Sequence, residues 1–328
     1  MIDKIYDKPD IYNIYVPLPN NPLKNLNCYV IKTAVGNLVV DTGFGQRECF
    51  EALTEGLQEL EVDMDKATLY LTHLHSDHTG LVELIRTDRT RVIMGAEDYS
   101  YLDRTINGDI WAEFNRRFIA EGFPEADVYA QERENPAVVY APKKIFNAET
   151  IKGGESFFIG DYEFECVSTP GHTPGNTCLF LKNEKIMFLG DHVLFDISPN
   201  ITSWPFVKNS LENYLISLDA IAAYDIHLAL PAHRKNEMNV YERIEQLKSH
   251  HAKRIQGTFD IVKKKDYQNA YEIASQLKWS LRGKTWEACP VQQKWFATGE
   301  TMSHLDYLVE SNRIVKIKDG ARLVYRAK

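Results

Sequence analysis

Cysteine is scarce in this sequence, and the placement of the few cysteines argues against two kinds of protein. Five cysteines in 328 residues are odd in number and widely scattered, and no two form a C-x-x-C pair. A disulfide framework is built from paired cysteines, and a thiolate metal cage from closely spaced ones. We therefore expect reduced, mostly buried cysteines and neither of these two structures.

Long apolar runs are also absent. No stretch approaches the roughly 20 apolar residues that a membrane-spanning helix needs, although 44% of the chain is hydrophobic. Residues 1–9 mix charges of both signs and contain no apolar core of a signal peptide. We expect a cytoplasmic protein that does not associate with membranes.

The charge is unevenly distributed along the chain. The whole chain carries a net charge of -8, but residues 250–328 hold 15 Lys and Arg against 8 Asp and Glu, a balance of +7. Such asymmetry is typical of separate folding units, and the chain exceeds the usual size of a single domain. We expect a large domain over residues 1–245 and a small one over residues 246–328.

Short β-branched runs alternate with turn signals and helical patterns. A hairpin is predicted over 27–42, and a strand over 67–75 leads into a helix that begins near residue 79. The second half repeats this order, with strands between 156 and 189 and a helix near 209–224. We expect an α/β fold in which two β-layers, each covered by helices, pack sheet to sheet.

A helical segment over residues 98–128 interrupts this order. Its apolar side chains recur at every fourth position, at Ile106, Ile110, Phe114 and Phe118. The pattern fits a helix packed on the core as well as it fits a lid over an active site. As a lid, Trp111, Phe114 and Phe118 would suit the apolar part of a substrate.

The C-terminal residues predict a separate motif. Helical patterns cover 240–262, 267–279 and 301–311, and two alternating strands within 313–326 are joined through Asp319-Gly320, a strong hairpin signal. Three helices followed by a hairpin predict a winged-helix-like module.

The segment His73-Leu74-His75-Ser76-Asp77-His78 is the strongest chemical signal in the chain. His73 and His75 are two apart at a predicted strand end, so both project from one face, while Asp77 and His78 lie where the chain turns into a helix. Four ligand-capable side chains can then converge on one point. The segment therefore predicts a metal site.

Three further ligand-capable residues close strands of the second half. His172 lies between Gly171 and Thr173-Pro174-Gly175, Asp191 follows Gly190, and His233 follows Pro231-Ala232. Glycine and proline fix tight turns that present a side chain in a defined direction. Because all three would lie on one edge of the sandwich, we expect them to join the histidine cluster.

This order of motifs, from about residue 25 to 235, resembles the metallo-β-lactamase superfamily. The resemblance implies a four-layer αββα sandwich, here followed by the small winged-helix-like domain. For one metal ion it implies three ligands: His73, His75 and His172. For a second ion it implies Asp77, His78 and His233, with Asp191 bridging the two. It also implies that Asp41 is a buried carboxylate that orients a histidine ligand.

The ligand types set the expected chemistry. Imidazole and carboxylate ligands suit two divalent ions, with zinc expected first and iron or manganese as alternatives. We expect a hydroxide bridging the two ions to attack an ester-like bond. Asp77, near the attacking oxygen, would orient it and accept its proton.

The choice of substrate stays open between several interpretations. Members of the antibiotic-cleaving zinc class carry a cysteine where this chain has Asp191, which argues against that activity. The glycine-flanked His172 and Asp191 look like the glyoxalase II-like branch, so we expect a small acyl thioester as substrate.

Two alternatives come from the winged-helix-like module. One is an endoribonuclease or phosphodiesterase that uses the same metals, and the other is a nucleic-acid-binding regulator with a vestigial metal site. Binding of nucleic acid is not favoured, because the basic residues are dispersed. A homodimer is left open.

Overall fold

Residues 1–280 and 285–328 are described by the computed structural model, which is built around two face-to-face β-sheets. The first sheet has seven strands in the order β1-β2-β3-β4-β5-β6-β7. They span Ile2–Asp7, Asp10–Pro17, Asn25–Lys32, Asn37–Val40, Ala67–Leu71, Arg91–Gly95 and Glu149–Ile151. Strands β1 to β4 pair antiparallel, and β4 to β7 pair in parallel.

The second sheet has five strands in the order β12-β11-β10-β9-β8. In chain order from β8 to β12 they span Ser156–Ile159, Tyr162–Ser168, Thr177–Leu181, Ile186–Gly190 and Leu228–Pro231. Neighbours from β8 to β11 are antiparallel, whereas β12 runs parallel to β11.

The apolar side chains of these strands divide between two faces. In β3, Tyr29 and Ile31 belong to the core between the sheets, where the Tyr29 ring lies 5.5 Å from that of Phe188 in β11. Cys28 and Val30 belong to the core outside the sheet. Successive side chains of a strand point to opposite faces. Strands buried on both faces are therefore apolar almost throughout.

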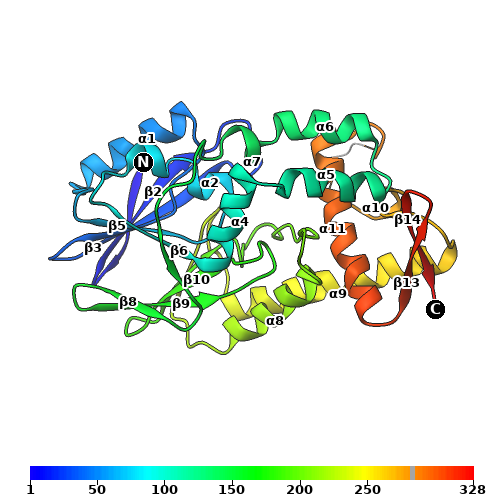
Figure 1. Cartoon of the computed structure of the whole chain (residues 1–328). Coiled ribbons are helices and arrows are strands. Elements are labelled where there is room, and N and C mark those ends of the chain that lie inside the picture. The colour runs from blue at the N-terminus through cyan, green and yellow to red at the C-terminus, as the bar shows by residue number, and fades with distance from the viewer. Residues whose placement is uncertain (281–284) are drawn as a thin grey trace.

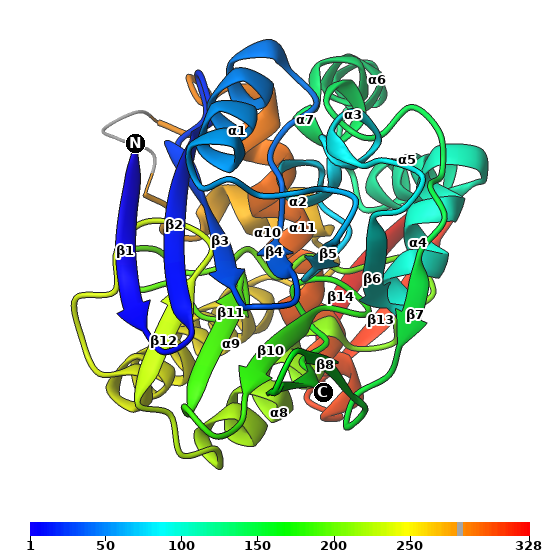
Figure 2. The ribbon, with the colours of Figure 1, turned by 90° about the vertical axis from the view of Figure 1, so that its left-hand side faces the viewer.

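Helices cover the outer face of each sheet (Figure 2). Helix α1 (Arg47–Glu59) lies on β2, and a Cβ atom on Gly56 would be 2.7 Å from Cγ2 of Ile14, so glycine permits this close approach. Helix α8 (Ser210–Ala222) covers the second sheet through Tyr214, Leu218 and other apolar side chains. The expected αββα sandwich is confirmed.

In sequence order, six helices follow α1 and precede the strands of the second sheet in the described chain. Helices α2 to α7 span Ser76–Thr79, Val82–Ile85, Ala96–Asn107, Ile110–Ala120, Glu125–Glu134 and Pro136–Val139. The helical prediction for residues 98–128 thus resolves into three helices, interrupted at Gly108 and Gly122. Figure 1 shows α5 and α6 reaching away from the sheets toward the C-terminal helices.

The C-terminal elements are α9 (Val240–Lys264), α10 (Ala270–Gln276), α11 (Val291–Glu310), and the antiparallel pair β13 (Ile314–Asp319) and β14 (Arg322–Ala327). The prediction of a helix over 301–311 was wrong at its start, because α11 begins ten residues earlier, directly after Pro290. Helices and hairpin are present as expected, and the winged-helix classification and the boundary at 245 stay predictions. No helix in the described ranges is long and apolar enough to cross a bilayer.

Candidate metal centre

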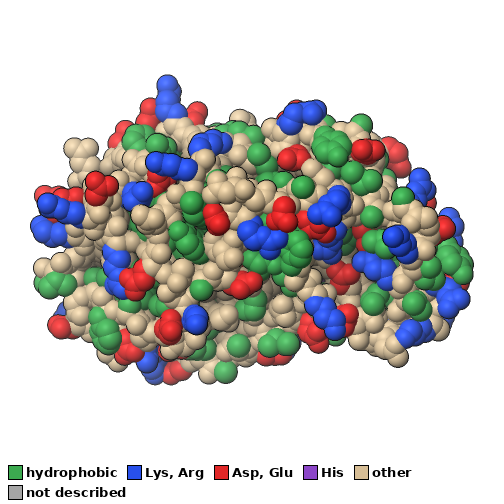
Figure 3. Space-filling model, in the orientation of Figure 1, with side chains coloured by type: hydrophobic (Ala, Val, Ile, Leu, Met, Phe, Trp, Pro, Cys, Tyr) green, Lys and Arg blue, Asp and Glu red, His purple; other side chains and the backbone are tan. Residues whose placement is uncertain are grey.

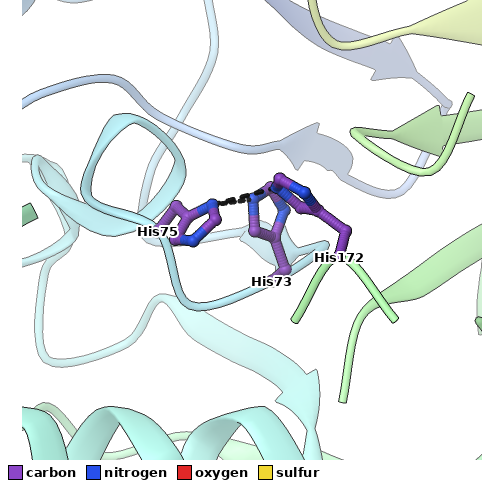
Figure 4. A group of neighbouring side chains, drawn as sticks. All are labelled: His73, His75 and His172. Carbon is purple, nitrogen blue, oxygen red and sulfur yellow. Dashed lines mark hydrogen bonds between the residues drawn. The ribbon is translucent and has the colours of Figure 1, made fainter. Parts of the chain in front are cut away.

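Three histidine rings converge beside the ends of β5 and β9. His73 and His75 follow β5, which ends at Leu71, earlier than the predicted strand over 67–75. His172 lies in the loop between β9 and β10. Nδ1 of His75 is 3.0 Å from Nε2 of His73 and 3.0 Å from Nε2 of His172. Figure 4 shows the three rings pointing toward one another. This is the spacing of ligand atoms that share one ion.

A second group adjoins the first. Nε2 of His233 lies 3.4 Å from Oδ2 of Asp77 and 3.3 Å from Oδ1 of Asp191. Nε2 of His78 lies 3.7 Å from the same Oδ1. The other oxygen of Asp191, Oδ2, is 3.6 Å from Nε2 of His172 in the first group. The two oxygens of Asp191 therefore face different groups, as a bridging ligand must.

Three of the five histidine rings are oriented through the nitrogen that points away from the site. Nδ1 of His172 donates to the carbonyl oxygen of Asn200 at 2.9 Å, and Nδ1 of His233 donates to that of Asn25 at 2.8 Å. Nδ1 of His78 lies 2.8 Å from Oδ2 of Asp41. A carbonyl oxygen only accepts, so in His172 and His233 a hydrogen sits on Nδ1, and Nε2 is the nitrogen that faces the site.

The donor set fits two divalent cations. Nε2 of His78, Nε2 of His233 and Oδ1 of Asp191 are buried without a hydrogen-bond partner in the described residues. Such orphaned atoms are costly unless something binds them, and imidazole with carboxylate is a ligand set for zinc, iron or manganese. The predicted ligands are thus brought together, and they could hold two ions.

The protonation states agree with this interpretation. Burial lowers the pKa of His75 to about 3, so its ring is neutral, as ligation requires. Burial raises the pKa of Asp191, but His233 and His78 outweigh it and hold that pKa well below its usual range. Burial lowers the pKa of His233, yet Asp191 and Asp77 raise it overall. The His233 ring therefore holds a second proton between these two carboxylates. A cation bound between them would replace that proton.

Asp41, predicted to orient a histidine ligand, lies against His78. Its carboxylate also accepts from the backbone N–H of Thr72 at 2.9 Å and from the Thr72 hydroxyl at 2.8 Å. Thr72 directly precedes His73, so this one buried carboxylate orients a ring of the second group and the segment that carries the first.

We expect Asp41→Asn to weaken metal binding by about 10- to 100-fold, because the amide cannot accept from both Thr72 and His78. Residue 41 has φ +62°, a conformation that asparagine also adopts, so the backbone should be retained. Chelator competition measures the affinity, with the exposed Asp161→Asn as control. Unchanged binding in Asp41→Asn would contradict the orienting role.

The aromatic residues predicted to line a substrate pocket lie close to the site but are mostly covered. Phe114 and Phe118 are 3% and 0% exposed. The Phe118 ring stacks on Trp295 of α11 at 4.7 Å, and Phe114 lies 5.3 Å from Trp204. Trp111 is half-buried beside Phe114. Their role toward a substrate stays a prediction.

Two residues that sequence reasoning missed touch the ligand loops. Trp204 donates from Nε1 to the carbonyl oxygen of His172 at 2.8 Å, and its ring stacks over His75 at 6.0 Å. Asp98 is fully buried and joins the loop of His73 and His75 to that of His172. Neither belongs to a local motif, so only the fold reveals them.

Comparison with known proteins agrees with the site. The family model described as the metallo-beta-lactamase superfamily matches residues 22–233. The crystal structure of a metallo-beta-lactamase family protein from Thermus thermophilus superposes with a TM-score of 0.81 at 27% identity, covering 97% of this chain and 98% of that chain. The probable metallo-hydrolase YqjP of Bacillus subtilis is 23% identical over 97% of this chain and 98% of its own length.

A third relative carries a more specific name. The atrochrysone carboxyl ACP thioesterase of Claviceps purpurea is 26% identical over 58% of this chain and 50% of its own length. A lactamase-like protein of Aspergillus niger is likewise matched over 50% of its own length. The chain thus spans about half the length of these two fungal relatives. The family match covers well over half of the chain, in the part that holds all seven candidate ligands, and we conclude that the chain belongs to the metallo-beta-lactamase superfamily.

Proposed function

We propose that this protein is a two-metal hydrolase that cleaves a small acyl thioester. The observation that carries the proposal is the position of Asp191, whose two oxygens face His172 on one side and His78 and His233 on the other. Two divalent ions held by these residues, with zinc expected first, would supply an activated water and stabilise the oxyanion that forms on the carbonyl.

Asp77 is the residue placed to handle the proton. Burial raises its pKa, but the neighbouring His78 and His233 outweigh burial, so the carboxylate is ionised at neutral pH. An ionised carboxylate can accept a hydrogen bond from the attacking water and then its proton. Water is consumed, the carbon–sulfur bond breaks, and a carboxylic acid and a thiol are released.

Two observations support an acyl thioester as the substrate. The Claviceps purpurea relative is named as a thioesterase. In this chain, Trp204 stacks over His75, and Phe114 packs on both Trp204 and Trp295, so the surroundings of His75 on this side are apolar. Apolar walls with few polar groups are typical of sites for small acyl ligands.

A phosphodiesterase acting on RNA is the second candidate, supported by the net +7 of residues 250–328. Figure 3 shows lysine and arginine side chains at the end of the molecule that carries β13 and β14, with acidic side chains among them. A nucleic-acid surface usually gathers basic residues in one patch. The mixed signs therefore favour the thioester.

The metal-loaded protein should hydrolyse acyl thioesters in a screen that also contains lactones, phosphodiesters and short RNA. Because the bound ions would activate the water, a chelator should reduce the activity to background and added zinc should restore it. Released thiol and cleaved RNA are measured separately. Activity on RNA alone would overturn the thioesterase proposal, and chelator-resistant activity would overturn the metal mechanism.

A further inference from the structure

The segment 200–204 contacts two ligand histidines. The carbonyl oxygen of Asn200 accepts from Nδ1 of His172, and Trp204 donates to the carbonyl oxygen of the same histidine while stacking over His75. Any shift of this segment therefore changes the direction in which Nε2 of His172 points.

Helix α11 fastens the same segment from the other side. Ser303 donates from Oγ to the carbonyl oxygen of Ile201 at 2.6 Å, and the N–H of Ser203 donates to that of Gly299 at 3.1 Å. A Cβ atom on Gly299 would lie 2.4 Å from Oγ1 of Thr202, so only glycine permits this approach. Figure 1 shows α11 beyond the sandwich, near α5 and α9, so a C-terminal element reaches the metal centre through this segment.

Glu300 makes the contact closest to the site. Its Oε2 accepts from the Asn200 side chain at 3.1 Å, and its Oε1 lies 3.2 Å from Nε of Arg254 in α9. Glu300 is 9% exposed. A buried carboxylate with a hydrogen-bond donor at one oxygen and a cationic group beside the other is restrained in direction, and the cationic partner offsets the cost of burying it.

Glu300 also belongs to a group with His250 and His251 whose ligand atoms lie within 4.8 Å of one another. Arg254 already supplies the positive charge beside its carboxylate. A metal ion there would be repelled by the guanidinium and would have to displace an existing contact. The geometry therefore favours a role for Glu300 toward Asn200.

We propose that Glu300 is a positioning residue for the metal centre. Held by Arg254, it fixes the side chain of Asn200, and the backbone carbonyl of Asn200 fixes the ring of His172. The C-terminal helices thereby tune one of the two ion sites from a distance. The inference rests on the proposed metal binding and is independent of the substrate.

Glu300→Ala should lower the affinity for one of the two bound ions by about 10-fold and leave the affinity for the other unchanged. Partners outside the ligand shell typically contribute 10- to 100-fold to affinity. Asn200→Ala should do the same, because it removes this hydrogen bond, together with a longer one of 3.4 Å to the carbonyl oxygen of Phe296, but keeps the backbone carbonyl of residue 200. The double variant should lose no more than either single one, since the two residues act in series. Glu300→Gln keeps an acceptor for Asn200 but turns its amide NH2 group toward Arg254, so its loss of affinity should lie between those of wild type and Glu300→Ala.

Stepwise dissociation constants come from chelator competition, and the visible bands of the cobalt-loaded protein report the ligand field. His172→Asn and His233→Asn identify which bands belong to which site. Thr301→Val is the matched control, because Thr301 is buried next to Glu300 and its hydroxyl donates to the carbonyl oxygen of Ala297 within the same helix. Its metal binding should equal that of wild type.

The outcomes separate the two proposals. If the wild-type chain binds no pair of ions, the metal proposal and this inference both fail. If the wild type binds two ions and Glu300→Ala and Asn200→Ala bind them equally well, only the positioning role is overturned. Equal weakening of both ions, or additive losses in the double variant, would show a general structural effect and overturn it as well. If Glu300→Ala does not fold, the Asn200→Ala variant, at a half-buried position, tests the positioning role by itself.

Discussion

Replacing Asp191 with alanine should lower kcat/KM for the hydrolysed substrate on the order of 10³-fold, and leave at most one firmly bound ion. Its Oδ1 faces Nε2 of His78 and His233, at 3.7 and 3.3 Å, and its Oδ2 faces Nε2 of His172 at 3.6 Å. Alanine removes the only carboxylate placed between the two groups among the described residues. The charge that balances two cations at that point is lost with it.

Metal analysis and steady-state kinetics on the same preparation measure both effects. Asp225→Ala is the control, since Asp225 is an exposed aspartate whose partner is Lys185 on the surface. A variant of Asp191 that kept full activity with two bound ions would exclude the bridging assignment. Loss of activity with both ions still bound would place Asp191 in catalysis without a bridging role.

The sandwich could be predicted because strands that are buried on both faces have a recognisable apolar sequence. Segments such as Asn25–Lys32 and Ile186–Gly190 are apolar on both faces and bounded by turn residues. The hairpin of β1 and β2 was not predicted. Much of β1 is half-exposed, and its residues Ile2–Asp7 are charged at several positions, so neither alternation nor a continuous apolar run marks it.

Helix α11 shows why a buried helix is hard to delimit. An amphipathic stripe arises when one face meets water, and α11 is buried along most of Trp295 to Leu305, including Thr298, Gly299 and Ser303. Small and polar residues inside that stretch are poor helix signals. They are present because the 200–204 segment packs against them, a contact between residues about 100 apart in sequence.

The seven ligand candidates were predictable for a different reason. Ligand types are few, and these residues follow strands in a recognisable order, with Asp77 and His78 in the short helix α2 after β5. Two of the groups that orient them are the backbone carbonyls of Asn25 and Asn200, and every residue has such a carbonyl. Asp98 is one carboxylate in a helix whose partners come from two distant loops. No local pattern encodes such contacts.

Asp98 should nevertheless be among the most sensitive positions for stability. It accepts from the N–H of Leu74 at 2.9 Å, from the Thr173 hydroxyl at 2.6 Å and from the N–H of Gly175 at 2.5 Å. Leu74 lies between His73 and His75, and Thr173 follows His172. One side chain thus ties together both loops of the first ligand group.

Asp98→Ala leaves two buried backbone N–H groups without an acceptor, at about 1–3 kcal/mol each, so we expect a loss of about 4 kcal/mol in the free energy of unfolding near pH 4. Metal affinity at the first group should fall as well, because its loops lose their common anchor. Denaturant unfolding of the metal-free protein measures the loss. Asp103→Ala, exposed on the same helix α4, should stay within about 0.5 kcal/mol of wild type.

The loss should depend on pH in a direction that the burial of Asp98 fixes. Burial raises the pKa of Asp98 from 3.8 to about 7, against the effect of its three donors. Between about pH 4 and 7 the folded chain keeps a proton that the unfolded chain has released, so the stability that this proton supplies is complete below about pH 4 and lost as the pH rises to 7. The difference in the free energy of unfolding between wild type and Asp98→Ala should therefore narrow by up to about 4 kcal/mol as the pH rises over that range. The slope is about 1.4 kcal/mol per pH unit. Subtracting the two profiles cancels the groups that both proteins share. A difference that widened with rising pH would mean that the three donors outweigh burial and that Asp98 is ionised in the folded protein throughout.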